Sequence, residues 1–144
     1  MDLRLGDIMT REVRSVETTN SVEEAAKIMK ELNVGSVPVT SGGRVVGIVT
    51  DRDLVLRNVA NGRGPRDTRV EEVMTTTVVS ATPDMDVHQA ADVMAKNQIR
   101  RLPVTENDRL VGIVSIGDLA VRNIYENEAG EALSNISQPS RPQA

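Results

Sequence analysis

Residues 47–57 read Gly47-Ile-Val-Thr50-Asp-Arg-Asp53-Leu-Val-Leu-Arg57, and residues 112–122 read Gly112-Ile-Val-Ser115-Ile-Gly-Asp118-Leu-Ala-Val-Arg122. In each stretch an apolar, β-branched segment ends at a hydroxyl residue, and an aspartate follows three positions later. This pattern predicts a strand that ends where a helix begins, with the aspartate in the first helical turn. One structural element therefore occurs twice in the chain.

The same offset relates a much longer part of the sequence. Residues 7–57 and 72–122 align without a gap, and 19 of the 51 positions are identical. A repeat of this length is one supersecondary unit, which cannot bury its apolar face alone. We therefore expect the two copies to pack about a pseudo-two-fold axis. The first repeat and the start of a linker should occupy residues 1–64 and the second repeat residues 65–126, while residues 127–144 should form a helix extension and a flexible tail.

The composition is typical of a soluble globular protein with an aliphatic core. Of the 144 residues, 39% are apolar and 26% are charged, and the chain has no Phe, Trp or Cys. It shows no signal-peptide pattern and no apolar stretch near the roughly 20 residues that span a bilayer. We expect a cytoplasmic protein without a membrane partner. The formal net charge of −4 disfavours binding to nucleic acid, although a local basic patch could hold a small anion.

Each copy follows the order strand, helix, strand, strand, helix, which predicts an α/β (α+β) fold of two β-α-β-β-α repeats. Residues 13–16 should be extended, and a capping box of Ser21 and Glu24 should begin a helix over about 21–33. The corresponding helix lies near residues 86–97. A linker is expected over residues 61–69.

A hairpin should follow each first helix. Its turn falls at Gly42-Gly43 in the first copy and at Asn107-Asp108 in the second. Because proline cannot donate to a strand ladder, Pro38 and Pro103 should lie at a strand start or edge.

The hydroxyl and carboxylate pairs, Thr50 with Asp53 and Ser115 with Asp118, allow two interpretations. A ribose cis-diol can donate two hydrogen bonds to one carboxylate, and a nearby helix start tolerates phosphate. Alternatively, the hydroxyl caps the helix and the aspartate favours its positive end. Either pair alone leaves both interpretations open.

The repeat resembles the CBS domain, and the chain resembles a stand-alone tandem pair, or Bateman module, over roughly residues 5–125. The resemblance rests on the joint recurrence of several motifs at one offset. They are Asp7-Ile-Met-Thr10, Ser36-Val-Pro-Val39, Gly47-Ile-Val-Thr-Asp-Arg-Asp53, Glu72-Val-Met-Thr75, Arg100-Arg-Leu-Pro-Val104 and Gly112-Ile-Val-Ser-Ile-Gly-Asp118.

In that family two clefts between the repeats commonly receive adenine nucleotides or other adenosyl ligands. The resemblance implies that Asp53 and Asp118 bind ribose, one in each cleft, with help from Thr50 and Ser115. It also implies phosphate contacts and a purine wall. Arg100 and Arg101 belong to the phosphate contacts, and the wall comprises Gly35, Ser36, Val37, Leu102, Ile113 and Ile48. AMP, ADP, ATP or a related compound would be a regulatory ligand, and no cofactor would be required.

The two copies differ at positions that bear on this site. Gly35-Ser36 in the first copy corresponds to Arg100-Arg101 in the second. We therefore expect the cleft of Asp118 to hold its purine against residues 35–37 and its phosphates toward the arginines, since a guanidinium can bind phosphate through two hydrogen bonds. The alternative is that the arginines are solvated or ion-paired. The cleft of Asp53 should then be weaker, empty or occupied by another ligand.

Neither a catalytic residue nor a metal ligand is predicted. His88 is the only histidine and has no Cys partner, and Asp51 beside Asp53 is replaced by Ile116 in the second copy. Because no nucleophile, base and orienting group recur together, we expect a binding module rather than an enzyme. A structural protein with unused clefts is the alternative.

The expected partners are a small-molecule nucleotide, a second copy of the chain and an unidentified protein target. Regulation would act in trans or through assembly, because nearly the whole chain is the pair. The resemblance suggests a homodimer, with the apolar faces of the helices near 21–33 and 86–97 as the candidate interface.

Overall fold

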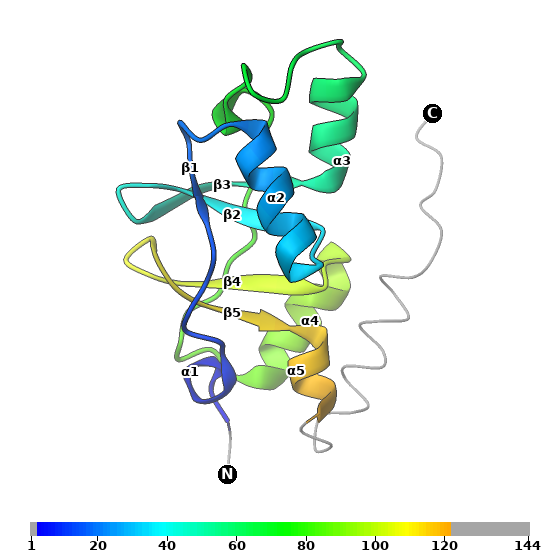
Figure 1. Cartoon of the computed structure of the whole chain (residues 1–144). Helices are drawn as coiled ribbons and strands as arrows, with labels where there is room; N and C mark the ends of the chain where they lie inside the picture. The colour runs from blue at the N-terminus through cyan, green and yellow to red at the C-terminus, as the bar shows by residue number, and fades with distance from the viewer. Residues whose placement is uncertain (1–2, 122–144) are drawn as a thin grey trace. The chain divides into compact units, whose positions relative to one another are not determined.

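The computed structural model describes residues 3–121, and the expected C-terminal helix extension and tail lie outside them. The chain divides into two compact units (Figure 1). One unit comprises residues 13–78 and 107–110, and the other comprises residues 3–12, 79–106 and 111–121. Both contain strands and helices, so the predicted α/β class is confirmed.

The first unit is built on three neighbouring strands. β1 (Val16–Glu17) runs parallel to β2 (Ser36–Ser41), which pairs antiparallel with β3 (Arg44–Thr50). The helices are α2 (Val22–Leu32), α3 (Asp51–Leu54), the π-helix η1 (Val55–Val59) and the 3₁₀ helix η2 (Val70–Glu72). Three apolar side chains of α2 are buried together with strand residues; the buried set is Val22, Ala25, Met29, Val37, Val39 and Val49.

The second unit repeats this plan with one strand reduced. β4 (Arg101–Glu106) neighbours β5 (Arg109–Ser115), which belongs to this unit from residue 111 onward. The helices are α1 (Leu5–Ile8), α4 (Val87–Asn97) and α5 (Ile116–Val121). The counterpart of β1 is a single parallel bridge between Ala81 and Val104. Its core is aliphatic, with Leu5, Met94 and Leu102 among its fully buried side chains.

The segment that begins each sequence copy packs in the unit of the other copy. Residues 3–12 lie with the second copy, where Thr10 forms an antiparallel bridge with Ile113. Residues 70–78 lie with the first copy, where Thr75 bridges Ile48 in the same way. Each unit therefore contains a strand-like segment from the beginning of the other repeat.

The predicted turn and cap are confirmed. Ser21 and Glu24 form the capping box of α2 through reciprocal side-chain bonds to backbone N–H groups. Gly42 and Gly43 have φ angles of 60° and 85°, and Asn107 and Asp108 have φ angles of 53° and 66°. Positive φ at both central residues is the requirement of a tight two-residue hairpin turn.

Two predictions about strands need correction. Only Val16 of the expected extended segment 13–16 lies in a strand, because pairing with β2 begins at that residue. Pro38 lies inside β2, not at its start or edge. Its missing N–H costs no ladder bond, because Ile48 opposite directs both its N–H and its C=O to Thr75, and β1 pairs with β2 only from Val39 onward.

The dimer interface expected on the first helix of each copy stays a prediction. Most apolar positions of α2 and α4 are buried within their own units, where they form the core, whereas Leu32 of α2 is 46% exposed. Among residues 3–121, three of the exposed large apolar side chains lie together on η1. These are Val55, Leu56 and Val59, with 55%, 49% and 67% of their surface exposed.

Candidate functional site

The Thr50 and Asp53 pair lies where β3 passes into α3. The Thr50 hydroxyl accepts a hydrogen bond from the Asp53 N–H at 3.1 Å, and the Asp53 carboxylate accepts one from the Thr50 N–H at 3.0 Å. This arrangement is a capping box, so the pair caps the helix, as the second interpretation of the sequence predicts. It also holds the carboxylate in one orientation, which a role in ligand binding would require.

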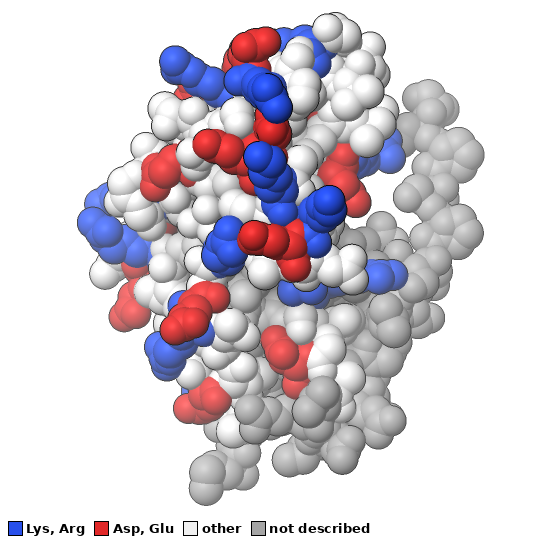
Figure 2. Space-filling view, in the orientation of Figure 1, with Lys and Arg blue, Asp and Glu red and all other residues white. Residues whose placement is uncertain are grey.

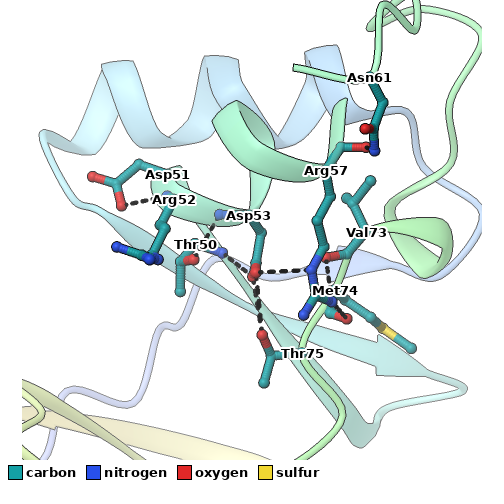
Figure 3. A network of polar contacts seen from close by, with 9 residues as sticks. All are labelled: Thr50, Asp51, Arg52, Asp53, Arg57, Asn61, Val73, Met74 and Thr75. Carbon is teal, nitrogen blue, oxygen red and sulfur yellow. Dashed lines mark hydrogen bonds and ion pairs between the residues drawn. The ribbon is translucent and has the colours of Figure 1, made fainter. Parts of the chain in front are cut away.

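Two further side chains approach the same carboxylate (Figure 3). The Thr75 hydroxyl lies 3.2 Å from both Asp53 oxygens, and the Arg57 Nε lies 3.9 Å from Asp53 Oδ1. Arg57 also donates through Nη1 to the backbone oxygens of Met74 at 3.1 Å and Val73 at 3.4 Å. Asp53 is consequently only 8% exposed.

The Ser115 and Asp118 pair repeats the capping geometry in the other unit. The Ser115 N–H donates to the Asp118 carboxylate at 2.8 Å, and the Ser115 hydroxyl accepts from the Asp118 N–H at 3.1 Å. Within residues 3–121 no other hydrogen bond or ion pair reaches this carboxylate, which is only partly buried. Within residues 3–121 the Asp118 carboxylate therefore accepts fewer hydrogen bonds than the Asp53 carboxylate.

A backbone contact common to both copies determines which residue lies beside each aspartate. The Asp51 N–H donates to Gly35 O, and the Ile116 N–H donates to Arg100 O, both at 2.9 Å. A β-carbon on Gly35 would lie 3.1 Å from an Asp51 carboxylate oxygen. The start of α3 is therefore acidic, whereas the start of α5 has an apolar residue and an arginine.

The two arginines that are expected to bind phosphate, Arg100 and Arg101, lie at the start of β4 in the Asp118 unit. Arg100 is exposed and Arg101 is half-buried, and neither guanidinium has a hydrogen-bond or ion-pair partner within the described part of the chain. The alternative interpretation is solvated or ion-paired arginines; the described residues provide no ion pair for them, and the solvated alternative stays open. These two cations therefore have donors available to a ligand.

The expected purine-wall residues divide between the units. Gly35, Ser36, Val37 and Ile48 lie with Asp53, whereas Leu102 and Ile113 lie with Asp118. The side chains of Val37 and Leu102 are 1% and 0% exposed and belong to the two cores. The hypothesis that Asp118 shares a ligand with residues 35–37 joins residues of both units and stays a prediction.

Charged residues elsewhere form ion pairs rather than a site. Figure 2 shows side chains of both signs gathered over α2. There Glu23 pairs with Arg66 and Lys27, and the hydrogen bond from Arg66 is the main reason that the pKa of Glu23 is lowered. In the linker Arg63 pairs with Glu72.

His88 is exposed on α4. Among residues 3–121 no group of three or more His, Asp or Glu side chains is placed to hold a metal ion.

Neither Thr75 nor Arg57 was predicted from the sequence as a site residue. Thr75 was missed because it lies 22 residues from Asp53 in the chain. The identity of Thr10 and Thr75 in the repeat alignment was the available indication, because such a position is common to both copies.

The sequence matches the family model of the CBS domain over residues 5–58 and 70–122. The CBS domain-containing protein YhcV of Bacillus subtilis is 47% identical over 131 residues, which cover 91% of this chain and 93% of YhcV. This chain belongs to the CBS domain family and contains two of these domains in tandem, as the resemblance predicted.

Solved structures agree with this assignment. The crystal structure of Hypoxic Response Protein I with two coordinated zinc ions has 31% identity and a TM-score of 0.74, over 82% of this chain and 97% of that protein. The hexameric CBS-CP12 protein from bloom-forming cyanobacteria has 34% identity and a TM-score of 0.67, over 83% and 67% respectively.

Pairs of CBS domains are generally regulatory modules, and the comparisons indicate no enzymatic family. Within residues 3–121 no helix is both long enough and apolar enough to cross a bilayer.

Proposed function

We propose that this chain is a cytoplasmic regulatory module that binds an adenine nucleotide or a related adenosyl ligand, and that the Asp118 site is the stronger of two sites. The observation that carries the proposal is the difference between the two aspartates. Within residues 3–121 the Asp118 carboxylate accepts a single hydrogen bond, from Ser115, whereas the Asp53 carboxylate also accepts from the Thr75 hydroxyl. A carboxylate with free lone pairs can accept hydrogen bonds from both hydroxyl groups of a ribose diol.

The residues at the starts of α5 and α3 favour the same order, because Arg57 beside Asp53 is already engaged by that carboxylate and by two backbone carbonyl groups. Arg100 joins its backbone to the start of α5, and its guanidinium has no partner within residues 3–121. At the start of α3 the corresponding backbone contact joins Asp51 to Gly35, so a carboxylate lies there and no arginine takes part in the contact. A phosphate group carries negative charge, so it is attracted by the arginine and repelled by the second carboxylate. An anionic nucleotide should therefore prefer the Asp118 site.

Calorimetric titration tests this proposal directly. The panel comprises AMP, ADP, ATP, NAD, S-adenosylmethionine and cyclic dinucleotides. Asp118→Ala should weaken binding of the strongest ligand by about tenfold or more, because a hydrogen bond to a charged group is worth roughly 1.5–3 kcal/mol. Asp53→Ala is the matched variant and should have the smaller effect. Asp92→Ala, on the exposed face of α4, should have none.

Two results would contradict the proposal. A larger loss in Asp53→Ala than in Asp118→Ala would reverse the order of the sites. No binding of any ligand of the panel by the folded parent protein would favour a structural role. Thermal melting of each variant is needed, because both aspartates also cap helices.

The ligand would act by changing assembly or partner binding. It can shift such an equilibrium only by its difference in affinity for the two states. We propose a homodimer that presents this change to a protein target in trans. The hexamer named for CBS-CP12 supports oligomerisation as a property of related proteins.

A further inference from the structure

We infer that Thr75 makes the Asp53 site the weaker one, because its hydroxyl occupies the carboxylate that a ligand hydroxyl would otherwise use. The inference rests on the proposed function, since it explains the affinity of one of the two proposed sites. Thr75 donates toward both oxygens of Asp53 at 3.2 Å. A diol that binds there must displace this hydroxyl.

The backbone of Thr75 is fixed on β3. Its N–H donates to Ile48 O at 2.8 Å, and its C=O accepts from the Ile48 N–H at 2.9 Å. Gly47 permits this close approach, because a β-carbon there would lie 2.9 Å from Thr75 O. The backbone of Thr75 is therefore held beside the carboxylate by the fold, within reach of its hydroxyl.

Arg57, on η1, adds a second restraint on the segment that carries Thr75. Its Nη1 donates to the carbonyl oxygens of Val73 and Met74, the two residues that precede Thr75. Its Nε also lies 3.9 Å from Asp53 Oδ1 (Figure 3). Arg57 is thus a positioning residue that ties the segment carrying Thr75 to the helix that follows Asp53.

The other copy provides an internal comparison. Thr10 is the repeat counterpart of Thr75, and it exchanges the same two backbone hydrogen bonds with Ile113, both at 2.9 Å. Within residues 3–121, however, the Thr10 hydroxyl makes no hydrogen bond to Asp118. The same residue type on the same backbone pairing therefore occupies the carboxylate in one unit only.

The test uses the full chain with Asp118→Ala, so that binding reports on the Asp53 site. Adenosine is the probe, because it has the ribose but no phosphate to interact with Arg57. Thr75→Val should lower the Kd for adenosine about threefold to tenfold, because this is the change in affinity that one net hydrogen bond usually produces. Thr75→Ser keeps a hydroxyl and should bind like the Asp118→Ala parent. NMR titration can measure weak binding of adenosine to the Asp53 site.

Thr10→Val in the Asp53→Ala background is the matched control and should leave adenosine affinity at the Asp118 site unchanged. Arg57→Met should act in the direction of Thr75→Val, because the segment loses its restraint. An unchanged or weaker affinity in Thr75→Val would overturn the inference, and a weaker one would mean that the hydroxyl contacts the ligand.

A measurement without ligand separates this inference from the proposed function. The carboxyl ¹³C resonance of Asp53 should shift in Thr75→Val and stay in place in Thr75→Ser, since only valine removes the hydrogen bond. If the resonance shifts and no variant binds any nucleotide, the proposed function fails, but the hydrogen bond from Thr75 to the Asp53 carboxylate is confirmed. If it does not shift, the inference fails whatever the parent protein binds.

Discussion

Met74 lies directly over Gly47, and a β-carbon on that glycine would be 2.7 Å from the methionine sulfur. The same relationship holds between Met9 and Gly112, where the distance would be 2.5 Å. Each glycine lies in the second strand of a hairpin, and each methionine belongs to the segment that begins the other sequence copy. The absence of a side chain on the glycine is therefore what allows the segment to pair with the strand.

Gly47→Ala should destabilise the protein by about 1–3 kcal/mol, the usual cost of overpacking. The methionine side chain can move, but the Thr75 backbone oxygen at 2.9 Å cannot move without breaking the bridge to Ile48. Urea unfolding measures the change. Gly117→Ala is the control, because its β-carbon would meet nothing closer than 3.6 Å. Equal stability of the two variants would mean that the segment is not held as described.

Asn58 and Thr68 connect η1 to the linker. The Asn58 side chain is buried, with 1% of its surface exposed, and its amide donates to the Thr68 hydroxyl at 3.1 Å. That hydroxyl donates in turn to Gly64 O at 2.8 Å. Within the described residues the Asn58 side-chain oxygen has no partner, so the amide already depends on this one contact.

Thr68→Val should therefore destabilise the protein by about 1–3 kcal/mol, because a buried amide loses its partner. In the double variant Asn58→Leu/Thr68→Val the loss should be smaller than the sum of the single losses, since no unpaired amide remains. Chemical denaturation of all four proteins gives the coupling energy. Strictly additive losses would show that the two side chains do not interact.

Glu72 should make stability depend on acidic pH. Its pKa is lowered from the ordinary value of 4.5, first by the Arg69 backbone N–H and next by the Arg63 side chain. A carboxyl group whose folded pKa is lowered stabilises the fold fully above its unfolded pKa, and this stabilisation is lost as pH falls through the folded pKa. Glu72→Gln should therefore flatten the stability profile below pH 4.5.

Urea midpoints measured across that range for the parent and Glu72→Gln provide the comparison. Glu106→Gln is the control, because Glu106 is exposed and has no ion-pair partner within residues 3–121. If both variants follow the parent profile equally closely, the contribution of Glu72 is absent.

Local patterns in the sequence predicted the elements of the fold well. Ser21 and Glu24, Gly42 and Gly43, and the repeated hydroxyl and aspartate pairs act through neighbours a few residues away. The exchange of the starting segments was not predicted, because it depends on contacts between residues far apart in the chain. Thr75 was missed at the Asp53 site for the same reason. The length of β1 was also not predictable, since a strand ends where its partner ends.

The exposed apolar residues of η1 are the surface that we expect to form the proposed homodimer. Replacing Val55, Leu56 and Val59 together by serine should convert the dimer to a monomer and leave thermal stability nearly unchanged, because these side chains are largely exposed. Native mass measurement gives the subunit number. Val46→Ser on β3 is the control and should stay dimeric. A dimer that persists in the triple variant would exclude η1 as its interface.

Arg100 and Arg101 should distinguish nucleotides from adenosine. If their guanidinium groups bind phosphate, Arg100→Gln and Arg101→Gln together should weaken ATP binding at the Asp118 site by about tenfold or more, while adenosine binding stays unchanged. Calorimetry in the Asp53→Ala background isolates this site. Arg109→Gln, at the start of β5, is the control because it removes the same charge elsewhere in the chain. If the double variant loses the same affinity for ATP and for adenosine, the arginines support the structure of the site. If Arg109→Gln weakens ATP binding as much as the double variant does, only the net charge of the protein matters.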